Sequence, residues 1–288
     1  MEPCEFEFLN PIAVVASNII SIALSGMVVM YAVVVGVVNG GLNSKVSFCL
    51  SLGIICIDSL YSVFQAVGVL SSSGWACNLS SVGVVFMTLM STLLTCALTL
   101  NLQLIILHDV TVNSFMRVAY FVVPLLVSLV VSALPLVFGQ IGLHWQGEWY
   151  SCWHHDEHTP YGRMWTILTF YGWIMAGVIY CSVVVLLVAL RLRSHILRLR
   201  GSISPEARNT MIAANLAIKR VILYPVLPAV CYLIPIICLV TPLPYEALLV
   251  GALLQGLQGA CSAVIFFFNP LLIKDSGMAI KKITRTHQ

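Results

Sequence analysis

Seven long apolar stretches divide this chain, and they constrain its fold more than any other feature of the sequence. Each is long enough to cross the hydrocarbon core of a bilayer, which takes about 20 mostly apolar residues in an α-helix. The stretches are continuous and rich in Leu, Val, Ile and Ala, whereas the strands of a membrane barrel alternate apolar and polar residues. We therefore expect helical spans at 11–38, 45–71, 77–107, 115–142, 163–192, 211–240 and 246–273.

The positive charges lie almost entirely on one side of these spans. Thirteen of the fourteen Lys and Arg residues fall in the terminus or loops of that side, and only Arg163 falls on the other. Cytoplasmic loops of membrane proteins are enriched in Lys and Arg. The sequence therefore predicts an all-α membrane protein, a seven-transmembrane helix bundle with its N-terminus outside and its C-terminus in the cytoplasm.

The composition and the loop lengths indicate a single membrane domain. Hydrophobic residues make up 60% of the chain and charged residues 9%, which leaves too little polar surface to cover a soluble globule. We expect residues 1–10 to form an extracellular N-terminus, 11–273 the seven-transmembrane domain and 274–288 a short basic cytoplasmic tail. The acidic leader and the length of the first apolar run argue against a signal peptide.

The ten cysteines differ in their expected depth. Cys77 opens the third span on the outer side and Cys152 lies in the long outer loop, so both face an oxidising compartment in which a disulfide persists. We predict a disulfide between them, which would hold the loop over the mouth of the bundle. Cys4 is a third outer cysteine and leaves another pairing open. The cysteines within the spans are expected to pack as small apolar side chains.

Asp58 lies about half-way along the second span. An ionised carboxylate at this depth is costly, so such groups face the bundle interior and serve ion binding, protonation or a conformational switch. At about 1.5 Å per residue, Ser91 in the third span lies at a similar depth, which allows a polar cluster. The alternative is a protonated Asp58 hydrogen-bonded to a neighbour. Either interpretation makes Asp58 a buried polar hinge rather than a catalyst.

Prolines interrupt the sixth and seventh spans. Pro225 follows Tyr224 in the sixth span, and Pro270 follows Asn269 near the inner end of the seventh. A proline removes a backbone donor and loosens one helical turn. Asn269 could bond the carbonyls freed in this way or reach toward Asp58. Both a working hinge and a static kink are compatible with these residues.

These features together resemble those of a G-protein-coupled receptor. The resemblance covers nearly the whole chain and is carried by the seven spans, Cys77 with Cys152, Asp58, the Asn269-Pro270 pair and the basic third inner loop. It implies that an outer ligand favours a state in which the sixth helix moves outward and a heterotrimeric G protein binds at the inner face of the plasma membrane. Neither enzymatic chemistry nor a cofactor is implied.

The finer motifs are not those of the rhodopsin class. Asn101-Leu102-Gln103 stands where that class has Asp-Arg-Tyr. Instead, Cys152-Trp153, Tyr171-Gly172-Trp173 and Tyr224-Pro225 are similar to motifs of the cyclic-AMP-receptor-like and fungal nutrient-sensing receptors.

The resemblance also implies a G-protein-facing set at the inner ends of spans three, five and six. Its members are Asn101, Gln103, Arg191, Arg193, Lys219 and Arg220. A basic inner surface also suits anionic membrane lipids, and this alternative stays open for Arg198, Arg200 and Arg208.

The outer loop and the outer halves of the spans supply aromatic and polar side chains for an unidentified small molecule or peptide. The candidate ligand-binding residues are Gln65, Trp153, His154, Arg163, Trp173, Tyr232, Gln255 and Gln258. The alternatives are an interfacial aromatic belt and ordinary hydrogen bonding between helices. Adjacent histidines point in different directions on most backbones, so His154 and His155 do not indicate a metal site.

Other functions for seven helices leave different signatures. A transporter or channel is the alternative function, although its path would be lined by more polar or charged groups than Asp58 and a few Gln and Asn residues. Span 246–273 has no lysine that could form a Schiff base with retinal. Gly36 and Gly40 suit close helix packing, either in a homodimer or within one bundle.

Overall fold

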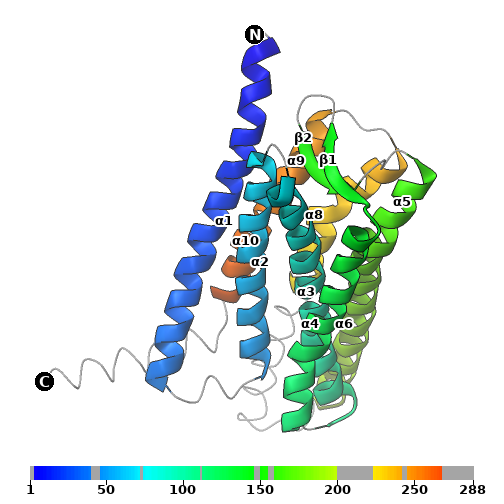
Figure 1. The fold of residues 1–288 in the computed structure, drawn as a ribbon. Coiled ribbons are helices and arrows are strands. Elements are labelled where there is room, and N and C mark those ends of the chain that lie inside the picture. Colours follow the sequence, from blue (N-terminus) through cyan, green and yellow to red (C-terminus); the bar gives the residue numbers. More distant parts are fainter. Residues whose placement is uncertain are drawn as a thin grey trace, which may run out of the picture.

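The protein forms a helical bundle with one small β-hairpin (Figure 1). The computed structural model describes residues 3–39, 46–71, 74–110, 112–145, 150–154, 159–199, 223–241 and 245–267. Within these ranges, six helical stretches are long and apolar enough to cross a membrane, and Leu223–Ile237 is a shorter apolar helix. The seven helices predicted from the apolar stretches are present, and the side of the membrane on which each terminus lies stays a prediction.

Two of the seven transmembrane rods, by which we mean the seven helical passes in chain order, consist of more than one helical element in the described residues. The elements are α1 (Pro3–Asn39), α2 (Val46–Leu70), α3 (Gly74–Leu107), α4 (Ser114–Val137), α5 (Pro160–Thr166), the π-helix η2 (Ile167–Tyr171), α6 (Gly172–Leu199), α8 (Leu223–Val240), α9 (Tyr245–Gly256) and α10 (Gln258–Phe267). The fifth rod runs through α5, η2 and α6, and the seventh consists of α9 and α10 on either side of Leu257.

Three helix boundaries differ from the predicted ones by five residues or more, and one of them is the end of the fifth helix, at Leu199 rather than 192. The first helix begins at Pro3, so most of the N-terminal segment expected at 1–10 continues the first span as helix. The fourth helix ends at Val137 rather than 142. Gly139 has a φ of +62°, which turns the chain out of the helix. The apolar pattern alone placed the boundary too late, because it continues into the strand that starts at Ile141.

The long loop between the fourth and fifth helices contains a β-hairpin that is attached to the third helix. Strands β1 (Ile141–Trp145) and β2 (Tyr150–His154) pair antiparallel with Leu143 opposite Cys152. The sulfur atoms of Cys77 and Cys152 are bonded, with their Cα atoms 5.2 Å apart. The predicted pairing is therefore present, and it fixes β2 to the start of α3. In Figure 1 the hairpin lies at the end of the bundle where α1 begins.

The third helix lies at the centre of the bundle. In its most apolar window 67% of the residues are buried, compared with 28% for the first helix. Val85 and Leu89 of α3 pack with Phe170 of η2 and Tyr232 of α8, which joins the third, fifth and sixth rods. The first helix packs at the edge of the bundle. Gly36, which we considered for a homodimer contact, is buried within the single chain and so serves internal packing.

The second and third helices approach closely at Gly83. A Cβ atom at this position would overlap the ring of Phe64 on α2. Gly83→Ala should therefore force the ring to move and lower stability by about 1–3 kcal/mol, the usual cost of overpacking. The melting temperature of the purified protein, followed by tryptophan fluorescence, would measure this loss.

Gly26→Ala is the matched control for Gly83→Ala. A Cβ atom at Gly26 on α1 would meet nothing within 4 Å, so this variant should melt at or slightly above the wild-type temperature. Equal melting temperatures for the two variants would contradict the close approach of α2 and α3.

Candidate functional site

A carboxyl group at the centre of the bundle joins three helices. Asp58 on α2 is 1% exposed. The Ser91 hydroxyl on α3 donates to its Oδ1 at 2.6 Å, and the Ser262 hydroxyl on α10 donates to its Oδ2 at 2.6 Å. The Gln258 side-chain amide also donates to Oδ1, at 3.2 Å. We call these four residues the Asp58 cluster.

The composition of the Asp58 cluster changes one assignment. Ser91 lies where the depth of Asp58 suggested, and it contacts the carboxyl group directly. Gln258, which we expected to line the ligand cavity, is buried and belongs to the cluster instead. Gln258 contacts Asp58 because a carboxyl group without hydrogen-bond donors is costly in an apolar interior. The neighbouring Gln258 amide supplies such a donor and lowers this cost.

The first helix supports the cluster through Ser21. The backbone N–H of Ala260 lies in the first turn of α10, where intrahelical acceptors are missing, and it donates to the Ser21 hydroxyl at 3.1 Å. The Ser62 hydroxyl also donates to Ser21, at 3.1 Å. A Cβ atom at Gly259 would lie 2.5 Å from the Ser21 hydroxyl oxygen, so glycine is required for this close approach.

Sequence reasoning missed the contribution of the first helix, although a signal was present. Ser17, Ser21 and Ser25 recur every four residues in an otherwise apolar span, which places them on one helix face. All three are buried. A regular row of hydroxyls in a membrane helix indicates a face that packs against another helix rather than lipid.

The cluster suits a conformational role better than a catalytic one. Both carboxyl oxygens of Asp58 already accept hydrogen bonds, and the donors come from two other helices. Any movement of α10 relative to α2 and α3 must break or exchange these bonds.

Among the residues that the structure describes, no group of three or more His, Cys, Asp or Glu side chains could hold a metal ion.

Three other predicted ligand residues form hydrogen bonds between helices. The Tyr61 hydroxyl donates to Gln255 Oε1 at 3.4 Å, and Gln65 Nε2 lies 3.5 Å from the Ala252 carbonyl oxygen. Tyr232 is fully buried, with its hydroxyl 3.2 Å from that of Thr88. In this conformation Gln65, Tyr232 and Gln255 therefore tie α2 to α9 and α3 to α8, which is the alternative that the sequence left open.

The hairpin residues Trp153 and His154 pack inward onto the π-helix. The Trp153 ring meets that of Phe170 edge to face, at 5.1 Å between centroids. His154 is fully buried, and its Nε2 lies 3.1 Å from the Thr169 hydroxyl. Burial lowers the pKa of His154 to about 4, so the ring is neutral near pH 7. These contacts hold the hairpin down over the bundle.

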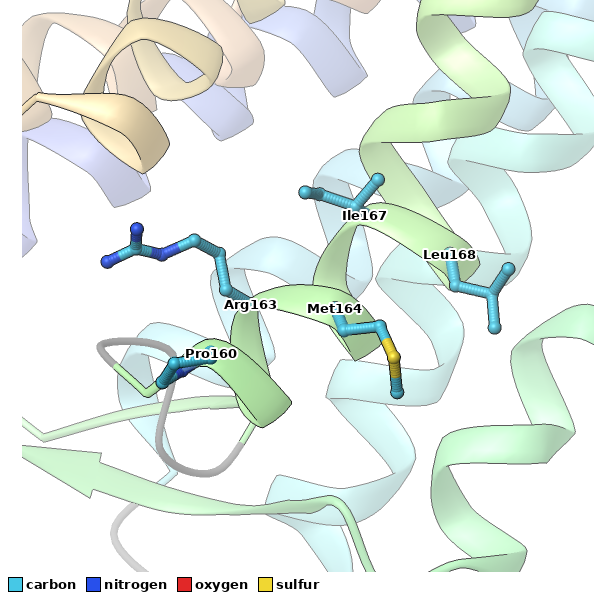
Figure 2. A pocket seen from close by; sticks show the side chains of 5 residues that line it. All are labelled: Pro160, Arg163, Met164, Ile167 and Leu168. Atoms are coloured by element: carbon cyan, nitrogen blue, oxygen red, sulfur yellow. The ribbon is translucent and has the colours of Figure 1, made fainter.

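The remaining two ligand candidates lie on the surface of the fifth rod. Arg163 is exposed and borders an open depression together with residues of α5 and η2 (Figure 2). Trp173 is partly exposed, and its indole N–H donates to the Leu168 carbonyl at 3.0 Å. The backbone of the π-helix bonds from residue i+5 to residue i, as from the Gly172 N–H to the Ile167 carbonyl.

The residues proposed to face a G protein have different environments. Asn101 is 2% exposed and donates through Nδ2 to the Ser47 hydroxyl at 3.1 Å, so it lies inside the bundle rather than on its surface. Gln103 accepts from the Tyr180 hydroxyl at 3.1 Å. Arg191 and Arg193 are exposed on α6.

Polar side chains near the end of a span find partners on adjacent helices, which explains the burial of Asn101.

Tyr224 and Pro225 are buried at the start of α8. Lys219, Arg220, Asn269 and Pro270 lie outside the described residues.

The comparisons with known proteins identify the fold. No family model and no curated protein matches this sequence. Among solved structures, the crystal structure of squid rhodopsin is similar, with a TM-score of 0.68 at 12% identity, covering 92% of this chain and 78% of that chain. At this identity the likeness shows the fold, and the chain is a multi-pass helical membrane protein with a rhodopsin-like bundle.

Removal of the central acceptor should destabilise the bundle. Asp58→Ala leaves the donors of Ser91, Gln258 and Ser262 without their partner, and each unsatisfied buried group costs about 1–3 kcal/mol. We expect the melting temperature to fall further for Asp58→Ala than for Ser262→Ala. Ser194→Ala is the control, because Ser194 is exposed and bonds only within its own helix. A wild-type melting temperature for Asp58→Ala would contradict the cluster's structural role.

The buried histidine should make stability depend on pH. Its folded-state pKa, about 4, lies below the usual 6.5, so the unfolded chain binds the proton first as the pH falls. Stability should therefore decrease by about 1.4 kcal/mol per pH unit between these two values and be independent of this group above pH 6.5. Melting temperatures between pH 7.5 and pH 4 would show the decrease.

Two variants separate this effect from general acid sensitivity. His154→Gln should flatten the pH dependence, whereas Gly26→Ala, which changes no titratable group, should leave it unchanged. The interpretation is wrong if His154→Gln retains the full dependence of the wild type.

Proposed function

We propose that this chain is a G-protein-coupled receptor of the plasma membrane that binds an extracellular ligand and activates a cytoplasmic heterotrimeric G protein. The observation that carries the proposal is the Asp58 cluster, which links α2, α3 and α10 inside a rhodopsin-like bundle. Helix movement would exchange these buried hydrogen bonds for others, and a ligand that binds one arrangement more tightly than the other would shift the population toward it.

The sixth rod is the element that moves in this proposal. Pro228 and Pro235 lie inside α8, and each removes one backbone hydrogen bond from the helix. Outside its apolar packing, α8 is tied to α3 by the contact between the Tyr232 and Thr88 hydroxyls. A ligand that alters this contact would bend α8 at its prolines and move its inner end outward, opening a site for the G protein.

The proposed orientation follows from the charges. The amino-terminal end and the hairpin face outward, and the end that carries the exposed Arg191 and Arg193 faces the cytoplasm, together with Lys219 and Arg220 of the sequence. These four side chains form the proposed G-protein contact, with membrane lipid as their alternative partner.

We also propose that the chain belongs with the cyclic-AMP-receptor-like and fungal nutrient-sensing receptors. The support is the three sequence motifs Cys152-Trp153, Tyr171-Gly172-Trp173 and Tyr224-Pro225. The first two meet in space, because Trp153 packs on Phe170 next to Tyr171 and His154 contacts the π-helix before Gly172. They therefore form one structural unit at the outer end of the fifth rod.

Nucleotide exchange on a purified Gα subunit tests the function. The receptor, reconstituted without added ligand in nanodiscs of phosphatidylcholine, should accelerate GTPγS loading above its uncatalysed rate. Replacement of Arg191, Arg193, Lys219 and Arg220 by Gln should slow the receptor-dependent loading about tenfold, because the complementary charges are lost. Gly26→Ala, whose added Cβ atom would meet nothing within 4 Å, is the control and should load Gα at the wild-type rate.

Two results would favour other functions. Unchanged loading by the fourfold variant, together with weaker binding to phosphatidylserine vesicles, would assign the basic residues to lipid. Ion flux in proteoliposomes without acceleration for any Gα would favour a transporter or channel.

A further inference from the structure

The seventh rod is interrupted at Leu257 although no proline lies there. The helix α9 ends at Gly256 and α10 begins at Gln258, and neither helix contains a proline. Where proline is absent, a membrane helix is interrupted by a π-bulge, by Gly and Ser residues, or by a side chain that enters the ladder of backbone hydrogen bonds. The contacts around Leu257 identify which of these applies.

The Ser21 hydroxyl of α1 enters the ladder at this interruption. The Ala260 N–H donates to the Ser21 hydroxyl oxygen at 3.1 Å. In an uninterrupted helix the same N–H would donate to the carbonyl four residues earlier, that of Gly256. The next backbone bond, from the Cys261 N–H to the Leu257 carbonyl at 3.0 Å, is regular again. A side chain of another helix therefore occupies one turn of the seventh rod.

Two glycines allow α1 to come close enough for this contact. A Cβ atom at Gly256 would overlap the Ser17 hydroxyl oxygen, and one at Gly259 would lie 2.5 Å from the Ser21 hydroxyl oxygen. The first helix packs against both α9 and α10. The hydroxyl-bearing face of α1 therefore lies directly against the two turns that flank the interruption.

The Ala260 N–H has two possible acceptors, and it must use one of them. Ala260 lies well inside the apolar span Leu249–Phe267, where no water is present to bond a free N–H. Bonding to Ser21 and bonding to the Gly256 carbonyl each satisfy the donor, whereas a position between the two satisfies it poorly. This favours two discrete arrangements of the seventh rod over a continuous range.

The interrupted turn also carries two donors of the Asp58 cluster. Gln258 and Ser262 flank Ala260, and both donate to the Asp58 carboxyl group. Closing the turn would rotate α10 relative to α9 and carry these donors with it. The other half of the rod has its own bond to α2, from the Tyr61 hydroxyl, so α9 can keep its place while α10 turns.

We propose that the seventh rod hinges at Leu257 and that Ser21 is the positioning residue that holds the hinge open. In the open form the Ala260 N–H bonds to Ser21, and the Asp58 cluster is complete. In the closed form the N–H bonds to the Gly256 carbonyl, and α9 and α10 become one helix. The hinge requires neither a ligand nor a G protein, so it does not rest on the proposed function.

Fluorine NMR of a label on Cys261 tests the proposal. Cys261 is exposed on α10, directly after Ala260, and disulfide exchange with trifluoroethanethiol labels it in the purified full-length chain in detergent. The Cys261→Ser variant identifies its resonance. The ratio of closed to open form, read from two resonances or from the position of their average, should rise at least about fivefold in Ser21→Ala, because the acceptor on α1 is lost.

Ser17→Ala is the matched control for Ser21→Ala. The Ser17 hydroxyl donates to the Val14 carbonyl of its own helix, so its removal should leave the ratio at the wild-type value. Gly256→Ala reaches the hinge by another route. Its methyl group displaces α1 from the interruption and favours a continuous helix, so it should raise the ratio as Ser21→Ala does, and it carries the test if Ser21→Ala does not fold.

Three results would overturn the proposal. The first is an identical Cys261 resonance in the wild type, Ser21→Ala and Gly256→Ala. The second is an equal change in Ser21→Ala and Ser17→Ala. The third is a lower melting temperature of Ser21→Ala with an unchanged resonance, because a static interruption would leave the Ala260 N–H unpaired without closing the turn. None of these readouts depends on nucleotide exchange, so a failure here is distinguishable from a failure of the proposed function.

Discussion

The hydrogen bonds to Asp58 are the interaction on which the rest of the bundle depends. Between helices in lipid, apolar contact gains little over contact with lipid chains, so polar bonds and close packing decide which helix faces meet. The Asp58 carboxyl group accepts from Ser91, Gln258 and Ser262 and thereby fixes α10 against α2 and α3. With α10 in this place, Ser21 of α1 can accept from the Ala260 N–H.

The hairpin and the sixth helix are held in different ways. The Cys77–Cys152 disulfide and the contact between His154 and Thr169 attach the hairpin to α3 and to the π-helix. The sixth helix, by contrast, contains three prolines, Pro225, Pro228 and Pro235, and Tyr232 joins it to α3 through the Thr88 hydroxyl. A helix with three prolines suits the proposed outward movement.

The likeness to squid rhodopsin at 12% identity has a physical explanation. Apolar side chains that face lipid can be exchanged with little cost as long as the span remains long enough. The arrangement therefore depends on a few polar contacts and on positions such as Gly83 and Gly259, where two helices approach too closely for a Cβ atom. Most of the sequence is free to vary within the same fold.

The sequence by itself determined the spans and the similar depth of Asp58 and Ser91, because these depend on local composition and on distance along one helix. It also predicted the sidedness of the charges and the pairing of Cys77 with Cys152, although Cys4 left another pairing open. Only the tertiary structure decided the partners of Asp58, because Gln258 and Ser262 lie 200 and 204 residues away and their contacts depend on how each helix is rotated in the bundle. The rotation of the helices also explains why Gln258, predicted to line the ligand cavity, bonds to Asp58, and why Asn101, predicted to face a G protein, is buried. The tertiary structure also showed that the loop between the fourth and fifth helices is a hairpin, because an isolated two-stranded hairpin is marginally stable and this one is bonded to α3 and packed on the bundle.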